Sequence, residues 1–385
     1  MTESESRTDV IVFSPYFPPA FLGGGPIRTL SALTLAAPPP FQPFVITSDT
    51  DLGQKSPLPV LRNMWSEYGG LPVYYFSTTS ILKTLKALVE VHRRRPAIIY
   101  LSSFFNFRFS IVPQLLIWTG YYTPGYTVLA PRGEFSDGAL SLKSTKKQLY
   151  LRLYRTSGLA KRTVWHASSE READDIRRAV GDAAKIIVRE NDTDLPETAR
   201  DGAASSSPHL RAVFVGRIVK IKGLLILLQG LRACRAELHL DIYGPEEDKA
   251  YASECREVAK LLPVNVRANF LGSLPNEQMR NALGKYDVML FPTFGENFGH
   301  VIPEALSASC PVICADVTPW TQRLLGGGGG IINENTPEGW RQAVEEYAAI
   351  EQNDRRHARR AAGRCFNEWR TGLSAPHIFE LLTPE

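Results

Sequence analysis

The sequence has no uninterrupted apolar run of about 20 residues, the length that a helix needs to cross a bilayer. It therefore predicts no transmembrane helix. Residues 1–8 are polar and acidic and lead directly into an apolar segment, so they do not have the pattern of a signal peptide. These features argue against an integral membrane protein and against secretion through a cleaved leader.

Cysteine is scarce, and the few cysteines do not form a recognisable framework. An odd number of them without metal-site spacing argues against a disulfide scaffold and against a zinc site. Most lie in apolar surroundings typical of reduced structural thiols, so we expect a cytoplasmic protein without a bound metal. The five cysteines are Cys234, Cys255, Cys310, Cys314 and Cys365.

The sequence also has little excess of charge of one sign. The formal net charge is +4, with 44% hydrophobic and 22% charged residues, as in an ordinary soluble globular protein. This balance is too mild to indicate nucleic-acid binding. The exception is the segment 143–162, which contains seven bases and no acid: Lys143, Lys146, Lys147, Arg152, Arg155, Lys161 and Arg162.

As a helix, the segment 143–162 would have one basic and one apolar face. Such a pattern is typical of a helix that lies on an anionic membrane surface, such as the inner face of the membrane. A solvated helix packed on its own domain explains the pattern equally well. Nucleic-acid binding is disfavoured because no recognised binding motif accompanies the bases.

The length of 385 residues suits two domains, each large enough for its own core. Between residues 190 and 210 the chain loses all helical or strand periodicity, as expected of a linker. We therefore place one domain at 1–195 and the other at 208–365. Apolar residues recur at helical spacing in the tail, which predicts a terminal helix over 366–385 that packs back on the first domain.

The second half begins with a strand–loop–helix unit. An apolar strand over 212–215 runs into Gly216-Arg217, and Lys222-Gly223 opens a helix that continues to 231. Glycine at 216 would let a ligand approach the backbone closely. Two cations at the carboxyl end of a strand can bracket a diphosphate, although two solvated surface cations would give the same pattern.

A second unit of this kind carries a pair of carboxylates. An apolar strand over 286–290 leads into a loop with Glu296, and Glu304 follows in the first turns of a helix. Both could face a cleft above a parallel sheet and accept hydrogen bonds from sugar or ribose hydroxyls. Alternatively, each acid only complements the helix macrodipole.

Taken together, these motifs resemble the carboxyl-terminal half of the family-4 retaining glycosyltransferases. The resemblance is carried by Gly216-Arg217, Lys222-Gly223, Glu296-x7-Glu304 and Pro311-Val312-Ile313. It implies the α/β GT-B fold, in which two Rossmann-like domains with parallel sheets face each other across a cleft. It also implies a nucleoside-diphosphate sugar of the UDP or GDP type as donor, with no metal and no further cofactor.

The resemblance assigns a role to each matching residue. Arg217 and Lys222 would neutralise the donor diphosphate, and Glu296 would hold donor-sugar hydroxyls, so these three are the expected catalytic residues. Glu304 would bind the ribose. The remaining donor contacts would come from the backbone at Gly216, Asn297, Phe298 and Gly299. One departure is Ser309, which stands where the family usually has glycine.

The first half opens with a strand over 9–13, a Gly23-Gly24-Gly25 loop and a helix over 27–35. The loop is not Gly-x-Gly-x-x-Gly, which argues against a nicotinamide dehydrogenase. In the resembling family this loop lies over the donor phosphates, and Gly24 is the best candidate for that contact. A flexible turn is the alternative.

A further loop, Pro131-Arg132-Gly133-Glu134, resembles the signature of a bacterial surface-polysaccharide subset of the family. Arg132 and Glu134 would contact donor or acceptor, or form a buried structural pair. Many family members carry a cleft histidine after the strand at 98–101, and this chain has none there. Ser103, Asn106 or His166 remain open as replacements, and no general base is assigned.

The expected activity is therefore a metal-independent, retaining hexosyl transfer to a sugar or lipid-linked acceptor in polysaccharide or glycoconjugate assembly. Two alternatives remain. One is another GT-B enzyme, such as a nucleotide-sugar epimerase or a phosphorylase. The other is a non-catalytic partner that only binds the nucleotide sugar.

Overall fold

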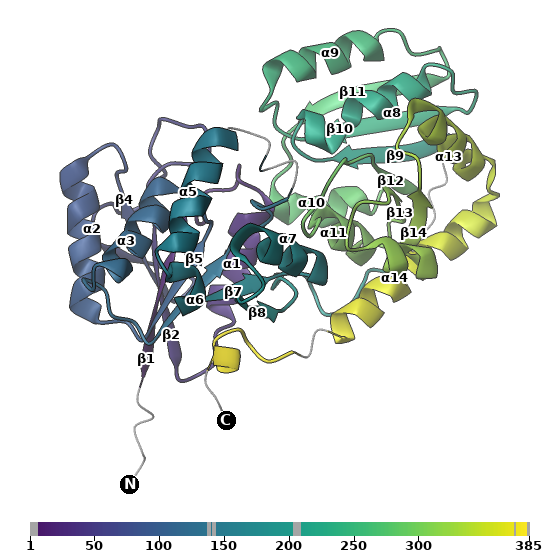
Figure 1. The fold of residues 1–385 in the computed structure, drawn as a ribbon. Coiled ribbons are helices and arrows are strands. Elements are labelled where there is room, and N and C mark those ends of the chain that lie inside the picture. Colours follow the sequence, from purple (N-terminus) through teal and green to yellow (C-terminus); the bar gives the residue numbers. More distant parts are fainter. Residues whose placement is uncertain (1–6, 137–139, 141–143, 203–208, 373–374, 383–385) are drawn as a thin grey trace. The chain divides into compact units, whose positions relative to one another are not determined.

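The computed structural model describes residues 7–136, 140, 144–202, 209–372 and 375–382. Lys143 of the basic segment and residues 203–208 of the expected linker lie outside the described ranges. The chain divides into two compact units, Met1–Asp194 with Ala375–Glu385, and Leu195–Ser374. Each unit is a mostly parallel sheet covered by helices, which confirms the predicted α/β class (Figure 1).

The first unit contains an eight-stranded sheet in the order β3-β4-β2-β1-β5-β6-β7-β8. All neighbouring strands are parallel except the antiparallel pair β3–β4. The loops that follow the parallel strands therefore emerge at one edge of the sheet. The strands are β1 (Thr8–Phe13), β2 (Phe41–Ser48), β3 (Trp65–Tyr68), β4 (Leu71–Phe76), β5 (Ile98–Ser102), β6 (Tyr126–Ala130), β7 (Thr163–Ala167) and β8 (Lys185–Val188).

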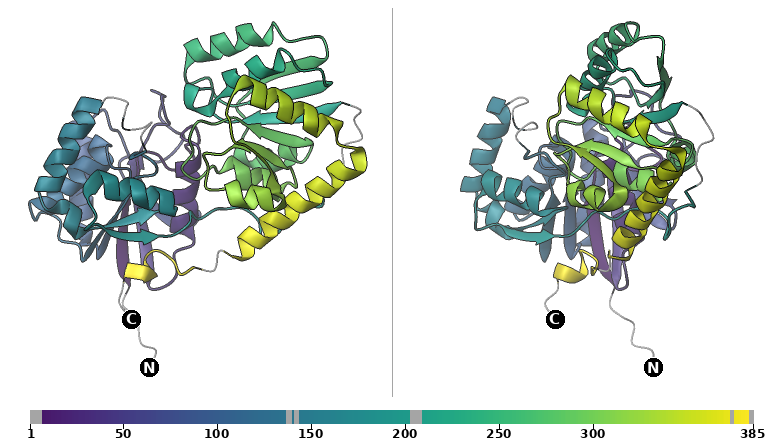
Figure 2. Two further views of the ribbon diagram at one scale, coloured as in Figure 1. Left: turned by 45° about the vertical axis from the view of Figure 1, so that its right-hand side comes forward. Right: turned by 90° about the vertical axis from the view of Figure 1, so that its right-hand side faces the viewer.

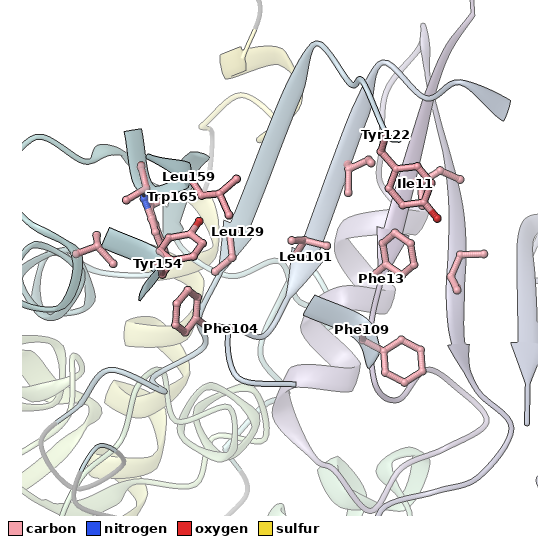
Figure 3. Packing of buried hydrophobic residues seen from close by; sticks show 14 of the residues in the cluster. Ile11, Phe13, Leu101, Phe104, Phe109, Tyr122, Leu129, Tyr154, Leu159 and Trp165 are labelled. Carbon is pink, nitrogen blue, oxygen red and sulfur yellow. The ribbon is translucent and has the colours of Figure 1, made fainter. Parts of the chain in front are cut away.

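The two faces of this sheet carry separate cores, because successive strand side chains point to opposite sides. Ile11 and Phe13 of β1 pack with the helices of one face, and Val10 and Val12 pack on the other. Figure 3 shows part of the first core, where Phe104, Tyr154 and Trp165 lie together. The helices of that face are α2 (Ile81–Arg94), the π-helix η1 (Phe107–Ile111), α3 (Val112–Trp118), α5 (Ser144–Thr156), α6 (Leu159–Arg162) and α7 (Glu170–Val180).

The opposite face is covered by α1 (Gly25–Leu35) and by the end of the chain. The tail expected as one helix over 366–385 is divided in the structure. Helix α14 (Gln352–Thr371) belongs to the second unit, whereas residues from Ala375 onward, including the 3-10 turn η4 (Glu380–Leu382), belong to the first. Phe379 is buried there, and His377 Nε2 lies 3.0 Å from the carbonyl oxygen of Leu33.

The second unit contains a six-stranded, wholly parallel sheet in the order β11-β10-β9-β12-β13-β14. Because β9 and β12 are neighbours, the loops after these two strands lie next to each other. The strands are β9 (Leu210–Val215), β10 (Leu238–Tyr243), β11 (Val266–Gly272), β12 (Val288–Phe291), β13 (Val312–Ala315) and β14 (Gly329–Ile332).

Helices cover both faces of this sheet as well. One core contains α8 (Leu224–Leu231), α9 (Lys249–Ala259) and α13 (Pro337–Ala349). The other contains α10 (Asn276–Leu283), α11 (Val301–Ser307), the π-helix η3 (Leu324–Gly328) and α14. The short helix α12 (Thr321–Arg323) precedes η3 and has no buried residue. Within the described ranges, no helix is both long and apolar enough to span a membrane.

Candidate active site

The loop after β9 is packed directly on the backbone at the end of β12. Its 3-10 turn η2 (Lys220–Lys222) is followed by Gly223, which has a φ of 71°. A Cβ atom at this position would lie 1.9 Å from the carbonyl oxygen of Pro292. Only glycine fits such an approach, and its conformation orients the residue before it.

This packing brings Lys222 next to Glu296. The Lys222 ammonium forms an ion pair with the Glu296 carboxylate, and the two side chains are 14% and 17% exposed. The ammonium also lies 5.4 Å from the centre of the Phe291 ring. Two of the three residues expected to be catalytic are thus in contact at the carboxyl edge of the sheet, although they come from different strand–helix units.

The β12 loop is held by hydrogen bonds from residues that carried no recognisable motif. Phe294 N donates to the Ile221 carbonyl at 2.8 Å. The amide of Asn335 donates to the Pro292 carbonyl at 3.1 Å, and Trp340 Nε1 donates to Asn335 Oδ1 at 2.7 Å. Asn335 therefore positions Glu296 indirectly. Sequence reasoning missed it because an asparagine before a helix cap has no chemical signature.

Arg217 lies in the same β9 loop but has a different partner. Its Nη1 donates to Glu247 Oε2 at 2.7 Å, and the two side chains are 39% and 45% exposed. The loop after β10 is packed on the β9 loop at Gly244, where a Cβ atom would lie 1.8 Å from the carbonyl oxygen of Gly216. The predicted cation pair therefore shares one loop, with each cation already next to a carboxylate.

Gly216 itself has room for a side chain. The atoms nearest to a Cβ at this position are 3.6 Å away or farther, which is ordinary van der Waals contact. The fold of the chain therefore does not explain a glycine at 216. The close approach of a ligand remains the predicted reason.

The other predicted donor contacts lie in the β12 loop and in α11. Glu304 is buried in the first turn of α11. Gly299 has a φ of 79°, and a Cβ atom there would lie 3.0 Å from Glu296 Cγ. Phe298 is a core residue whose carbonyl accepts a hydrogen bond from Trp320 Nε1 at 2.6 Å. Asn297 is partly exposed between Glu296 and this anchor.

Cys314 lies at the end of β13, close to the Lys222–Glu296 pair. Burial is the main cause that raises the pKa of its thiol to about 12, and Glu296 adds to the effect while Lys222 opposes it. A raised pKa keeps the thiol protonated at neutral pH, as is typical of a buried structural cysteine. Among the residues that the structure describes, no cluster of His, Cys, Asp or Glu could hold a metal ion.

In the first unit, Arg132 belongs to a directed chain of hydrogen bonds. Its Nη2 donates to the Tyr100 hydroxyl at 2.8 Å, and that hydroxyl lies 2.9 Å from His166 Nδ1. His166 Nε2 lies 3.1 Å from the Arg189 carbonyl, which can only accept, so Nε2 carries the proton and Nδ1 accepts. Burial lowers the pKa of His166 well below its usual value, in agreement with this neutral tautomer.

Glu134 is bound separately from Arg132. Its carboxylate accepts hydrogen bonds from Ser103 Oγ at 2.8 Å and from the backbone of Phe104 and Phe105 at 2.5 and 3.1 Å. Burial raises its pKa, and these donors oppose that effect. The suggested buried pair between Arg132 and Glu134 is therefore wrong, because each side chain supports a different loop.

The three open replacements for a cleft histidine all make structural contacts. His166 is buried in the chain described above, and Ser103 binds Glu134. Asn106 Oδ1 accepts a hydrogen bond from Phe109 N at 3.1 Å and caps η1. Gly24 is the N-cap residue of α1, with a φ of 67°. A Cβ atom at Gly24 would have no neighbouring atom within 4 Å, so this residue is an open turn in the first unit.

Comparison with known proteins gives the class of this architecture. Residues 209–349, all in the second unit, match the family described as "Glycosyl transferases group 1". The chain also superposes on Anabaena HepE, solved in complex with UDP-glucose, with a TM-score of 0.69, 15% identity and 95% coverage of both chains. Sucrose-phosphate synthase from Thermosynechococcus elongatus gives the same TM-score and identity, with coverage of 98% and 96%.

Sequence relatives fall in the same class. A GDP-mannose:cellobiosyl-diphosphopolyprenol alpha-mannosyltransferase of Xanthomonas oryzae pv. oryzae is 28% identical over 66% of this chain and 70% of its own length. A D-inositol 3-phosphate glycosyltransferase of Corynebacterium glutamicum is 26% identical, but the alignment spans only 42% of this chain and 43% of that protein.

These matches confirm the predicted fold, which is GT-B. They also confirm the resemblance inferred from the motifs: residues 209–349 match the group 1 glycosyltransferases, and the sequence relatives named above are glycosyltransferases.

Proposed function

We propose that this chain is a retaining glycosyltransferase that moves a hexose from a UDP- or GDP-sugar to an acceptor hydroxyl. The observation that carries the proposal is the Lys222–Glu296 ion pair, which two separate strand–helix units build at one sheet edge. An ammonium beside a carboxylate suits a ligand that has an anionic diphosphate next to a polyhydroxylated sugar. Arg217, on the same loop as Lys222, supplies a second cation.

The proposed chemistry follows from these charges. The bond between the anomeric carbon and the diphosphate oxygen breaks, and its electron pair leaves with the diphosphate. Lys222 and Arg217 stabilise the negative charge that develops there. The acceptor oxygen forms its new bond on the same face of the sugar, and its proton goes to the departing phosphate. No protein base is required for this step.

Each carboxylate has a distinct role in the proposal. Glu296, on the loop, accepts hydrogen bonds from sugar hydroxyls and keeps the Lys222 ammonium in place. Glu304, buried in α11, accepts hydrogen bonds from the ribose. The backbone at Gly216 and at Asn297 to Gly299 approaches the phosphate and sugar oxygens. The donor is bound without a metal or another cofactor.

The relatives support a role in polysaccharide or glycoconjugate assembly. The Xanthomonas relative uses GDP-mannose and an acceptor on a diphosphopolyprenol lipid. Another relative is a putative teichuronic acid biosynthesis glycosyltransferase of Bacillus subtilis, 28% identical over 28% of this chain. We therefore propose a sugar or lipid-linked acceptor for this chain as well.

A lipid-linked acceptor agrees with the proposed membrane contact of the segment 143–162. Leu151 and Tyr154 of α5 are buried, whereas Leu149 and Leu153 are 60% and 59% exposed. The exposed leucines lie one turn apart among basic side chains such as Lys146. We propose peripheral contact with the cytoplasmic face of a membrane, where the five free cysteines would stay reduced.

The proposal is tested by a thermal-shift screen of nucleoside diphosphates and their sugars, followed by incubation with the best donor. A bound nucleotide raises the stability by about 2.7 kcal/mol at a hundredfold excess over Kd. Transfer to an added acceptor with retained anomeric configuration, unaffected by EDTA, is the expected outcome. Conversion of the donor in the absence of an acceptor would indicate an epimerase. A requirement for phosphate would indicate a phosphorylase, and binding of the donor without turnover would indicate a non-catalytic partner.

A further inference from the structure

Helix α2 in the first unit has an outward apolar stripe besides the one that it buries. Ala87 and Val91 pack into the core, as expected of a surface helix. Leu82, Leu85 and Val89, at helical spacing on another side, are 78%, 52% and 38% exposed. A water-soluble surface helix does not need this second stripe, so it indicates an interaction surface.

The apolar surface continues onto the neighbouring helix α3. Leu115 and Trp118 are 48% and 56% exposed, and Tyr121 in the turn after α3 is 40% exposed. The turn is attached to α2, because the Tyr121 ring stacks on His92 with 4.2 Å between ring centres. The two helices lie side by side on the same face of the sheet (Figures 1 and 2).

The segment that carries this surface has an excess of positive charge. Between residues 81 and 122 the sequence contains one acid, Glu90, which pairs with Arg93 at 3.1 Å. Arg94 turns inward, to Asp9 and the ring of Phe44. The other bases of this region are exposed: Lys83, Lys86, Arg95 and Arg108.

We propose that this α2–α3 surface, defined by Leu82, Leu85, Val89, Leu115, Trp118 and Tyr121, binds an anionic phospholipid bilayer. The leucines and valine enter the boundary between headgroups and acyl chains, and Trp118 and Tyr121 lie at the level of the headgroups. The exposed bases face lipid phosphates. The excess of positive charge around an outward apolar stripe distinguishes this occupant from a second copy of the chain, whose equivalent surface would bring the same charge.

This surface is distinct from the segment 143–162, although both lie on the same helical face of the sheet. It also contains none of the residues assigned to the donor site, and the Lys222–Glu296 pair belongs to the other unit. The proposal therefore stands or falls separately from the proposed activity.

The test is flotation of the full-length protein with vesicles of phosphatidylcholine alone or mixed with phosphatidylglycerol. We expect binding to the mixed vesicles only. The double substitution Leu82→Glu with Leu85→Glu should abolish it. Lys83→Gln with Lys86→Gln should lower the partition coefficient about twentyfold, since each base near an anionic membrane contributes about fivefold. The matched control is Val264→Glu, at a 98% exposed position in the second unit, which should float like the wild type.

A second readout reports the depth of Trp118 directly. Brominated lipids should quench part of the tryptophan fluorescence in the wild type, and Trp118→Phe should remove that part. Thermal unfolding of each variant at the wild-type temperature shows that the fold is intact. Substitution of Lys146, Lys147 and Arg152 by glutamate measures how much α5 contributes to vesicle binding, separately from α2.

Three results would overturn the proposal. One is failure of the wild type to bind the anionic vesicles. Another is unchanged flotation of the folded Leu82→Glu, Leu85→Glu variant. The third is a wild-type dimer in sedimentation that this variant converts to a monomer without any effect on lipid binding, since that result would assign the surface to a second copy of the chain.

Discussion

Lys222 and Glu296 form an ion pair although 74 residues separate them in the sequence. The pair connects the loop after β9 to the loop after β12, and it is mostly shielded from solvent. In the proposed reaction, the donor phosphate binds the Lys222 ammonium, which the Glu296 carboxylate has already oriented. The pair is therefore the centre of the proposed donor site.

Removal of either cation should slow the reaction without unfolding the chain. We expect Lys222→Ala or Arg217→Ala to lower the turnover by about 10²–10³, the scale of losing one preorganised charge donor. The measurement is the steady-state rate with saturating donor and acceptor. Lys220→Ala, at an exposed position on the same turn, is the matched control and should retain normal activity. Near-normal turnover in both cation variants would contradict the assignment.

The two carboxylates should be separable by experiment. Glu296→Ala should reduce the turnover more than it reduces the affinity for the nucleoside diphosphate. Glu304→Ala should weaken the nucleotide itself, because the ribose loses an acceptor. Isothermal titration calorimetry with the nucleotide, combined with initial rates, distinguishes the two effects. If the Glu304 variant binds the nucleotide normally and the Glu296 variant does not, the assigned roles are reversed.

Two glycines of the β9 loop should respond differently to the same small substitution. Gly223→Ala places a methyl group on the Pro292 carbonyl and requires a positive φ, so we expect a loss of about 3 kcal/mol or more in the free energy of unfolding. Gly216→Ala meets only ordinary contacts and should fold normally, yet bind the donor more weakly. Chemical denaturation and calorimetry measure the two effects. Unimpaired donor binding by Gly216→Ala would remove the predicted close approach of the ligand there.

The buried His166 should make the stability depend on pH. Burial lowers its pKa in the folded chain, whereas the unfolded chain titrates near 6.5. Below about pH 6.5 the unfolded state therefore binds more protons than the folded state. As the pH decreases further, the free energy of unfolding decreases by up to about 1.4 kcal/mol per pH unit. Burial lowers the pKa of His377 in the same direction, so the two histidines add.

Urea denaturation at pH 7.5 and 5.5 checks this dependence. His166→Gln should be less stable than the wild type at pH 7.5, since the bonds to Tyr100 and Arg189 change, but it should lose less stability on acidification. His357→Gln, at an exposed position on α14, is the control and should follow the wild type. An identical loss of stability in the wild type and His166→Gln would show that His166 does not contribute.

Much of the second unit could be predicted from its sequence because its motifs are local. An apolar strand, a loop with glycine and a helix follow each other within a few residues, so β9–α8 and β12–α11 were expected. The spacing of Glu296 and Glu304 placed one on the loop and one in the helix. The contact between Lys222 and Glu296 could not be predicted in this way, because it depends on β9 and β12 being neighbours in the sheet. Local sequence patterns do not indicate the order of the strands.

Other features could not be predicted because they depend on contacts between distant segments. Arg132 and Glu134 are neighbours in sequence, but the structure directs them to different loops, toward Asn191 and Ser103. Ser309 adopts a φ of 53° in place of the family glycine and is held by a hydrogen bond from its Oγ to the Arg200 carbonyl, 2.5 Å away. The outward stripe of α2 can be recognised only once the structure shows that Ala87 and Val91 form the buried side of the helix.

The central claim is tested most directly by a crystal structure of this protein with the nucleoside diphosphate that the thermal-shift screen selects. We predict a diphosphate within about 2.7–3.2 Å of Lys222 Nζ, with Arg217 turned from Glu247 toward it and the ribose hydroxyls on Glu304. A nucleotide bound away from these side chains, with the Lys222–Glu296 pair undisturbed and remote from every phosphate, would contradict the account.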